Sequence, residues 1–155
     1  MNNRKHILLL LAVLVTGLMA MGYDAVDKTM AKNILLKTNR AIGVAHIVTK
    51  KTKNYTGKLA KAVSHERLAK KLYNNGNYLR AIHHSRRARL YAADIMNTNK
   101  AKPTSDMSFS PQEEQAFGAL PSDKELDDEL AKEDSSVLVS KDEDLMNGNL
   151  GIDVQ

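Results

Sequence analysis

The sequence predicts an all-α protein, and three features of the chain lead to this fold class. Apolar residues recur every three or four positions over three long segments, which is the spacing of a helix with one buried face. A turn rich in Asn and Gly separates the second segment from the third. Residues 1–102 carry 20 basic and 4 acidic side chains, whereas residues 103–155 carry 3 and 14, for net charges of +16 and −11. We therefore expect a basic helical domain at residues 24–100 and an acidic tail at residues 101–155.

Residues 1–22 have the features of a secretion signal. Arg4 and Lys5 are followed by an apolar run of about 15 residues and then by small side chains. A membrane-spanning helix needs about 20 apolar residues, so a cleaved signal peptide is favoured and an uncleaved anchor is the alternative. Because the two basic residues keep the N-terminus cytoplasmic, the rest of the chain is expected to be exported. It would be periplasmic, secreted, or attached to the outer side of the cytoplasmic membrane.

The first predicted helix covers residues 24–52 and is the longest. Its apolar positions form one stripe, with lysine and arginine on the other faces. The stripe consists of Val26, Met30, Ile34, Leu35, Ala41, Ile42, Ala45 and Val48. The segment from Asn54 to Gly57 then interrupts the pattern and ends the helix.

Two further helices are predicted at residues 58–74 and 78–97, joined by the turn Asn74–Asn77. Gly and Asn tolerate the left-handed backbone with which helices end, so this turn favours a helical hairpin. Many alanines lie on one face of the third helix, which indicates that its neighbour packs close. We expect the 24–52 helix to cover the hairpin and complete a small three-helix domain. The alternative is self-association of the hairpin into a homo-oligomer.

The acidic tail is expected to be mostly disordered, because it has too few apolar residues to build a core of its own. Two short helices are predicted within it. One starts at Ser110 and Pro111, and the other at Ser122, which forms a capping box with Glu125. The tail is either a solubilising extension or a segment that docks on the chain's own basic helices. The apolar groups among its acids favour docking.

Residues 65–92 resemble one tetratricopeptide repeat, a helix–turn–helix unit. The matching residues are Leu68, Ala69, Leu72, Gly76, Tyr78, Ala81, Ile82 and Ala88. The chain departs from the family pattern at His65, at Ser85 and in the missing closing proline. One repeat cannot bury its own apolar face, which is a second reason to expect a covering helix. The resemblance implies a peptide-binding inner face made of Glu66, Lys70, Tyr73 and Asn74.

The third helix also carries a basic stripe, a candidate polyanion site made of Arg80, His84, Arg86, Arg87 and Arg89. Because Arg80, His84 and Arg87 are spaced by four and three residues, they share one face of the helix. Such a face suits lipopolysaccharide, an acidic cell-wall polymer, anionic lipid or nucleic acid. The competing interpretation is a solvated face balanced by the acidic tail, and it is favoured because the tail supplies a counter-charge.

The sequence contains none of the patterns that catalysis or metal binding would require. It has no cysteine, no phosphate loop or dinucleotide motif, and no pair of histidines spaced to bind one metal ion on a helix. We therefore expect a non-enzymatic protein without a cofactor. Its expected role is interaction with an unidentified protein partner in the periplasm or at the cell surface. Binding of an anionic polymer or a membrane surface is the alternative.

Overall fold

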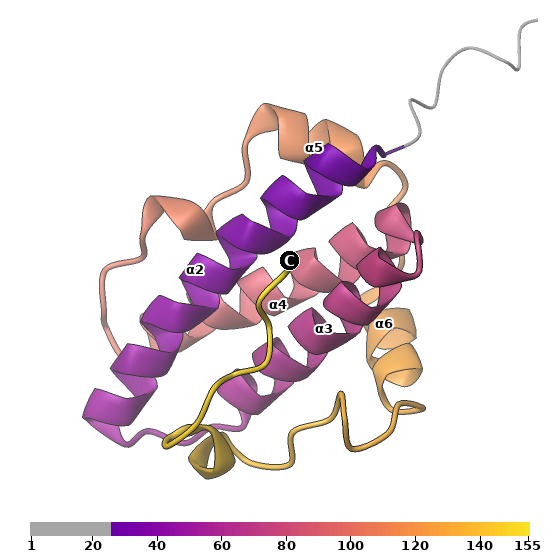
Figure 1. Cartoon of the computed structure of the whole chain (residues 1–155). Coiled ribbons are helices and arrows are strands. Elements are labelled where there is room, and N and C mark those ends of the chain that lie inside the picture. The colour runs from indigo at the N-terminus through magenta and orange to yellow at the C-terminus, as the bar shows by residue number, and fades with distance from the viewer. Residues whose placement is uncertain (1–25) are drawn as a thin grey trace, which may run out of the picture.

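Three long helices form the frame of the protein in the computed structural model, which describes residues 26–155 (Figure 1). They are α2 (Lys28–Thr52), α3 (Lys58–Asn74) and α4 (Tyr78–Thr98). The rest of the chain contains α5 (Pro111–Phe117), α6 (Asp123–Leu130) and two 3₁₀ turns, η1 (Ser105–Met107) and η2 (Asp142–Leu145). No strand occurs in the described range, so the predicted all-α class is confirmed there. The signal peptide expected at residues 1–22 lies outside the described residues.

Helix α2 begins at a side-chain cap and ends at a left-handed residue. The Asp27 carboxylate accepts a hydrogen bond from the Met30 amide at 2.6 Å. At the other end Lys53 has φ +56°, and its amide donates to the Thr49 carbonyl. Between these ends the predicted stripe is buried against α3 and α4; its innermost residues are Ala31, Ile34, Leu35, Ala41, Ile42 and Ala45. None of the helices in residues 26–155 has both the length and the apolar composition that crossing a membrane would require.

Helices α3 and α4 form the predicted antiparallel hairpin, and α2 lies across both of them (Figure 1). Gly76, with φ +78°, makes the left-handed turn, and the Asn77 amide donates to the Leu72 carbonyl at 2.9 Å. Buried alanines let the helices approach closely; they are Ala62, Ala69, Ala81, Ala88 and Ala92. The expected arrangement of one long helix covering a hairpin is therefore present in the described residues.

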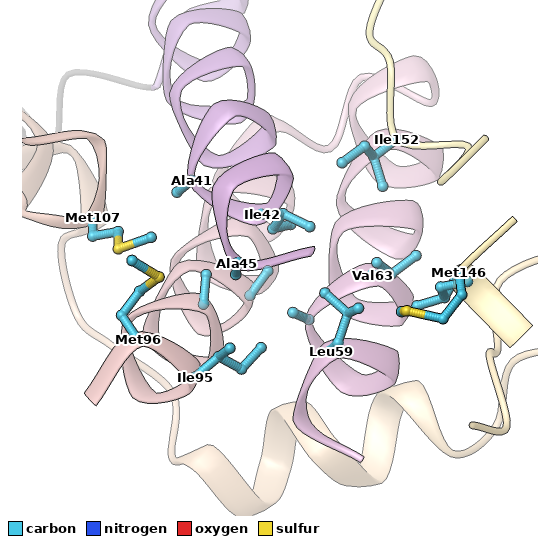
Figure 2. Packing of buried hydrophobic residues seen from close by; sticks show 14 residues of the cluster. Ala41, Ile42, Ala45, Leu59, Val63, Ile95, Met96, Met107, Met146 and Ile152 are labelled. Carbon is cyan, nitrogen blue, oxygen red and sulfur yellow. The ribbon is translucent and has the colours of Figure 1, made fainter. Parts of the chain in front are cut away.

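The C-terminal segment contributes side chains to the same core as the frame (Figure 2). Met107, Leu145, Met146 and Ile152 pack in one cluster with residues of α2, α3 and α4. Phe117 of α5 is fully buried in a second cluster between the long helices. Figure 2 shows Met107 and Met146 entering the first cluster from opposite sides of the frame.

The tail therefore differs from the mostly disordered segment that its composition suggested. Residues 101–155 still have too few apolar side chains for a core of their own. In the structure these side chains do not form a separate core, because they are inserted a few at a time into the surface of the three-helix frame. Outside the pairs Lys58–Asp94 and Lys124–Asp128, the ion pairs of residues 26–155 join the tail to this frame. The frame supplies both the apolar surface and the counter-charge that the tail lacks.

The start of α3 shows how the tail completes the frame. Gly57 stands at the cap position and has no side chain that accepts a hydrogen bond from the first amides. Asp142 performs this role from the tail, because its carboxylate accepts from the amides of Gly57 and Ala60, both at 2.8 Å. Asp142 is itself buried. A distant residue therefore caps a helix whose own sequence provides no cap.

Candidate functional site

Four basic residues of α3 and α4 lie together on one side of the hairpin. We define the basic face as His65 of α3 with Arg80, His84 and Arg87 of α4. The sequence spacing predicted that the three α4 residues share a side of the helix, and the structure places them together. Helix α6 lies across this face, so that its acidic side chains, rather than bulk water, meet the basic ones.

Each arginine of the basic face binds two carboxylates of α6. The pairs are Arg80–Glu125 (2.7 Å), Arg80–Glu129, Arg87–Asp123 (2.7 Å) and Arg87–Asp127 (3.2 Å). Arg87 also lies over the Tyr91 ring, 4.4 Å from its centroid. The side chains of Arg80 and Arg87 are 21% and 15% exposed, whereas those of Glu125 and Asp123 are 54% and 62% exposed, so water partly shields these pairs.

A buried pair of histidines lies at the centre of the basic face. The Nδ1 atoms of His65 and His84 are 3.0 Å apart, and the two rings are stacked with centroids 5.3 Å apart. The outer nitrogens reach α6: His65 Nε2 is 3.1 Å from Asp127 Oδ1, and His84 Nε2 is 3.1 Å from Glu129 Oε2. The histidine side chains are 1% and 0% exposed. The two imidazole rings therefore link a carboxylate at each end, and the four groups form one continuous hydrogen-bonded series through three helices.

Burial and the neighbouring charges set the protonation of these four groups. Burial, followed by the proximity of His84, lowers the pKa of His65 to about 4. Burial also lowers the pKa of His84, although Glu129 opposes the shift. Arg80 lowers the pKa of Glu129. Burial raises the pKa of Asp127, but Arg87 and His65 outweigh it and the net shift is downward. At neutral pH both rings are therefore neutral, both carboxylates are charged, and the arginines supply the positive charge.

Helix α6 adds an apolar contact to these ionic ones. Leu126 and Leu130 are both buried, and Leu130 packs with Leu68 of α3 and Val137 of the tail. Leu126 and Leu130 lie one helical turn apart, on the side of α6 that faces the hairpin. The basic face thus binds a short amphipathic helix by carboxylates and leucines together.

The tail has a second, deeper attachment at α5. Arg89 of α4 is fully buried and donates to Glu113 Oε1 at 2.6 Å, and it also binds two groups of α2. Lys37 of α2 donates to the other oxygen of Glu113 at 2.8 Å. Burial raises the pKa of Glu113, yet Lys37, the Ser110 amide and Arg89 together lower it to about 2. Glu113 is therefore a fixed anion inside the protein, whereas the α6 carboxylates are partly exposed.

The five residues expected to bind a polyanion divide into three environments. Arg80, His84 and Arg87 belong to the basic face. Arg89 points into the core toward α5. Arg86 lies over two phenylalanine rings of the tail, 5.3 and 5.6 Å from their centroids. All five are engaged with residues of the tail in this structure.

The four residues implied by the tetratricopeptide resemblance do not share one surface. Glu66 and Tyr73 are buried between the helices. Lys70 and Asn74 line a shallow groove beside the C-terminal segment, and Lys70 donates to the Gly151 carbonyl. Burial raises the pKa of Glu66 to about 8, although Ser85 and Arg89 oppose the shift. Glu66 is therefore a protonated core residue at neutral pH.

The histidine pair was not predicted, because only pairs of histidines on a single helix were considered and these two stand on different helices. A signal for it is nevertheless present in the sequence. His65 lies nine residues before the Asn74–Asn77 turn and His84 lies seven residues after it, and residues at similar distances from the turn lie near one another in an antiparallel hairpin. No comparable signal identifies Asp127 and Glu129 as their partners, because the path of the tail depends on contacts distant in sequence.

Within residues 26–155 no group of three or more His, Asp or Glu side chains is arranged to hold a metal ion. Each nitrogen of the histidine pair already has a partner in the chain. The arrangement is suited to binding an acidic helix and to holding a proton between the two rings. In comparisons with protein-family models, curated proteins and solved structures, nothing matches this chain.

Proposed function

We propose that the protein is a non-enzymatic interaction protein whose basic face binds an acidic amphipathic helix, and that α6 is the ligand the chain carries for itself. The observation that supports this most is the match between the two surfaces. Four carboxylates of α6 meet two arginines and two histidines, and two leucines of the same helix are buried beside them. A partner protein would present the same pattern of acids and leucines and replace α6.

Helix α6 is better suited to release than α5. It buries two leucines, each contributing roughly 1.5–3 kcal/mol, and its ion pairs are partly exposed. Helix α5 instead inserts the fully buried Phe117 and binds the buried Arg89. A tethered segment competes at an effective concentration on the order of millimolar, so a free partner at micromolar concentration must bind the basic face roughly 1,000-fold more tightly than α6 does.

The place of action in this proposal follows from residues 1–22. Their charged start and apolar run suit export, so the interaction would take place in the periplasm or at the cell surface. Cysteine is absent from the chain, so a folded exported form depends on helix packing and on the ion pairs described above.

Binding of an anionic polymer to the same face is the competing proposal. It would use Arg80 and Arg87 after release of α6, with an affinity that falls steeply as salt increases. The buried Leu126 and Leu130 favour a peptide ligand instead, because a polyanion offers no apolar side chain to replace them.

The test uses the full chain and a peptide with the sequence of residues 120–133. Leu126→Ala with Leu130→Ala loosens the chain's own α6, and calorimetry then measures binding of the added peptide. We expect binding by the loosened chain and its loss after Arg80→Gln and Arg87→Gln. Asp128→Asn is the matched control, because Asp128 pairs with Lys124 alone, on the exposed side of α6. If the loosened chain stays folded and binds heparin but not the peptide, the competing proposal is correct.

A further inference from the structure

The histidine pair accommodates only a limited number of protons while α6 is in place. The two Nδ1 atoms are 3.0 Å apart, which is a hydrogen-bond distance between one N–H and one bare nitrogen. If both rings were imidazolium, two N–H groups would point at each other across this gap. The closed arrangement therefore requires that at least one of the two rings remain neutral.

Helix α6 lies against the outer edges of these rings. Both Nε2 atoms point at carboxylates of α6, Asp127 for His65 and Glu129 for His84. When α6 leaves, the rings become hydrated and free to turn apart, so that each can take its own proton. The open form therefore holds at least one proton more than the closed form in mildly acidic solution.

We propose that His65 and His84 form a pH-sensitive latch, in which protonation of both rings releases α6 and exposes the basic face to an acidic partner. The inference deepens the proposed function, since it rests on α6 being the releasable occupant of that face. Neutral pH keeps the face covered. Acidification below about pH 6 shifts the equilibrium toward the uncovered face, because an exposed histidine titrates near pH 6.5.

The charged groups around the pair act in opposite directions on a second proton in the closed form. Asp127 and Glu129 attract it, whereas burial and the arginines oppose it, and the net effect is opposition. From α4 and α6, the groups that face the two rings are Arg80, His83, Arg87, Tyr91, Asp127 and Glu129. The two arginines repel imidazolium, and each already binds a carboxylate of α6. The pKa values of Asp127 and Glu129 lie below their ordinary values, so neither carboxylate changes charge between pH 5 and 7. The histidines are thus the groups of this site that take up protons in that window when α6 leaves.

The sign and size of the effect follow from proton linkage. With a pKa of about 4 for His65 in the closed form and an ordinary value in the open form, the open form gains protons as the pH falls. Lowering the pH from 7 to 5 raises the ratio of open to closed α6 by about 20-fold for each excluded proton. A second excluded proton would square this factor.

Hydrogen exchange of the full chain, divided by the intrinsic rates at each pH, tests the latch. Amide protection in α6 should fall about 20-fold or more between pH 7 and 5, while protection in α4 stays unchanged. In His65→Phe with His84→Phe the α6 protection should be independent of pH. His46→Gln is the matched control, because His46 contacts the Leu145 carbonyl, away from α6, and the pH effect should persist in it.

Constant α6 protection in the wild-type chain, or an unchanged pH effect in the double Phe variant, would overturn the proposal. If that variant fails to fold, ring titration of the wild-type chain by NMR decides instead. Two rings that both become charged above pH 6 with α6 still protected contradict the latch. If α6 opens at pH 5 but the chain binds no acidic peptide, the latch is supported and the proposed function is refuted. The failure of one proposal can therefore be told from the failure of the other.

Discussion

Replacing Arg89 by methionine should be among the most costly single changes in the protein. Its guanidinium is fully buried and binds Glu113, Thr38 and the Ile34 carbonyl at 2.6, 3.0 and 2.9 Å. Methionine keeps much of the apolar volume and removes every one of these hydrogen bonds. It also leaves Glu113 as a buried carboxylate that has lost one of its two cationic partners.

The expected size of the loss follows from these contacts. Breaking a buried ion pair by removing one partner costs about 3–5 kcal/mol. Glu113 keeps the Lys37 ammonium and the Ser110 amide, both at 2.8 Å, so the lower end of the range applies. We expect the free energy of unfolding to fall by about 3 kcal/mol, which is a large part of the stability of an ordinary domain. Urea unfolding followed by far-ultraviolet circular dichroism measures this difference.

Arg86→Met is the matched control for this measurement. Arg86 lies on the same helix and over tail phenylalanine rings, but it pairs with no carboxylate of residues 26–155. Its replacement should cost about 1 kcal/mol or less. Adding Glu113→Gln to Arg89→Met should recover part of the loss, because it removes a buried carboxylate that has lost one of its two cationic partners. A loss below about 1 kcal/mol for Arg89→Met, or one equal to that of the control, would refute the reasoning.

Four further changes test other parts of the account. Burial raises the pKa of Glu66 to about 8, so the wild-type chain should lose stability as the pH rises from about 4.5 to 8. Glu66→Gln should remove that loss, so the free energy of unfolding at pH 8 should rise by roughly 4 kcal/mol and that at pH 4 should not rise. Urea unfolding of both proteins at the two pH values measures this difference. Asp142→Ala should cost about 1–2 kcal/mol and speed amide exchange in the first turn of α3, since the two capping bonds are lost. Asp127→Asn should weaken attachment of α6 more than Asp128→Asn does, as the exchange rates of α6 amides would reveal. Stopping the chain after Lys102 should expose the core surface that Met107, Phe117 and Ile152 cover, and light scattering should then detect aggregation. A truncated chain that stays monomeric and helical would contradict the last expectation.

The frame could be predicted from the sequence because its signals are local. A stripe with helical spacing and the Asn-Gly turn predict α2 and the hairpin within a few residues. The predicted start at residue 24 missed the cap at Asp27, where α2 begins. The short helices of the tail also carried local signals. Ser110 and Glu113 form the full capping box of α5. Ser122 caps α6, but the Glu125 side chain binds Arg80 and does not complete the predicted box.

The docking of the tail could not be established in the same way, because the groups involved are far apart in the chain. Composition alone indicates disorder, since the tail cannot bury its apolar residues by itself. The basic stripe indicated a face for anions, but nothing in it distinguishes a foreign polymer from α6. Burial of Arg89 and Glu66 was likewise invisible, because charged side chains at helical spacing normally face water.

The account depends most on α6 being a replaceable occupant of the basic face and not a fixed part of the core. Native-state hydrogen exchange of the unmodified chain at pH 7, with increasing urea below the unfolding transition, tests this directly. We predict that amides of α6 exchange through a local opening, with a free energy well below that of α4 and little dependence on urea. If α6 and α4 exchange with the same free energy and the same urea dependence, the helix opens only when the whole protein unfolds, and the account is contradicted.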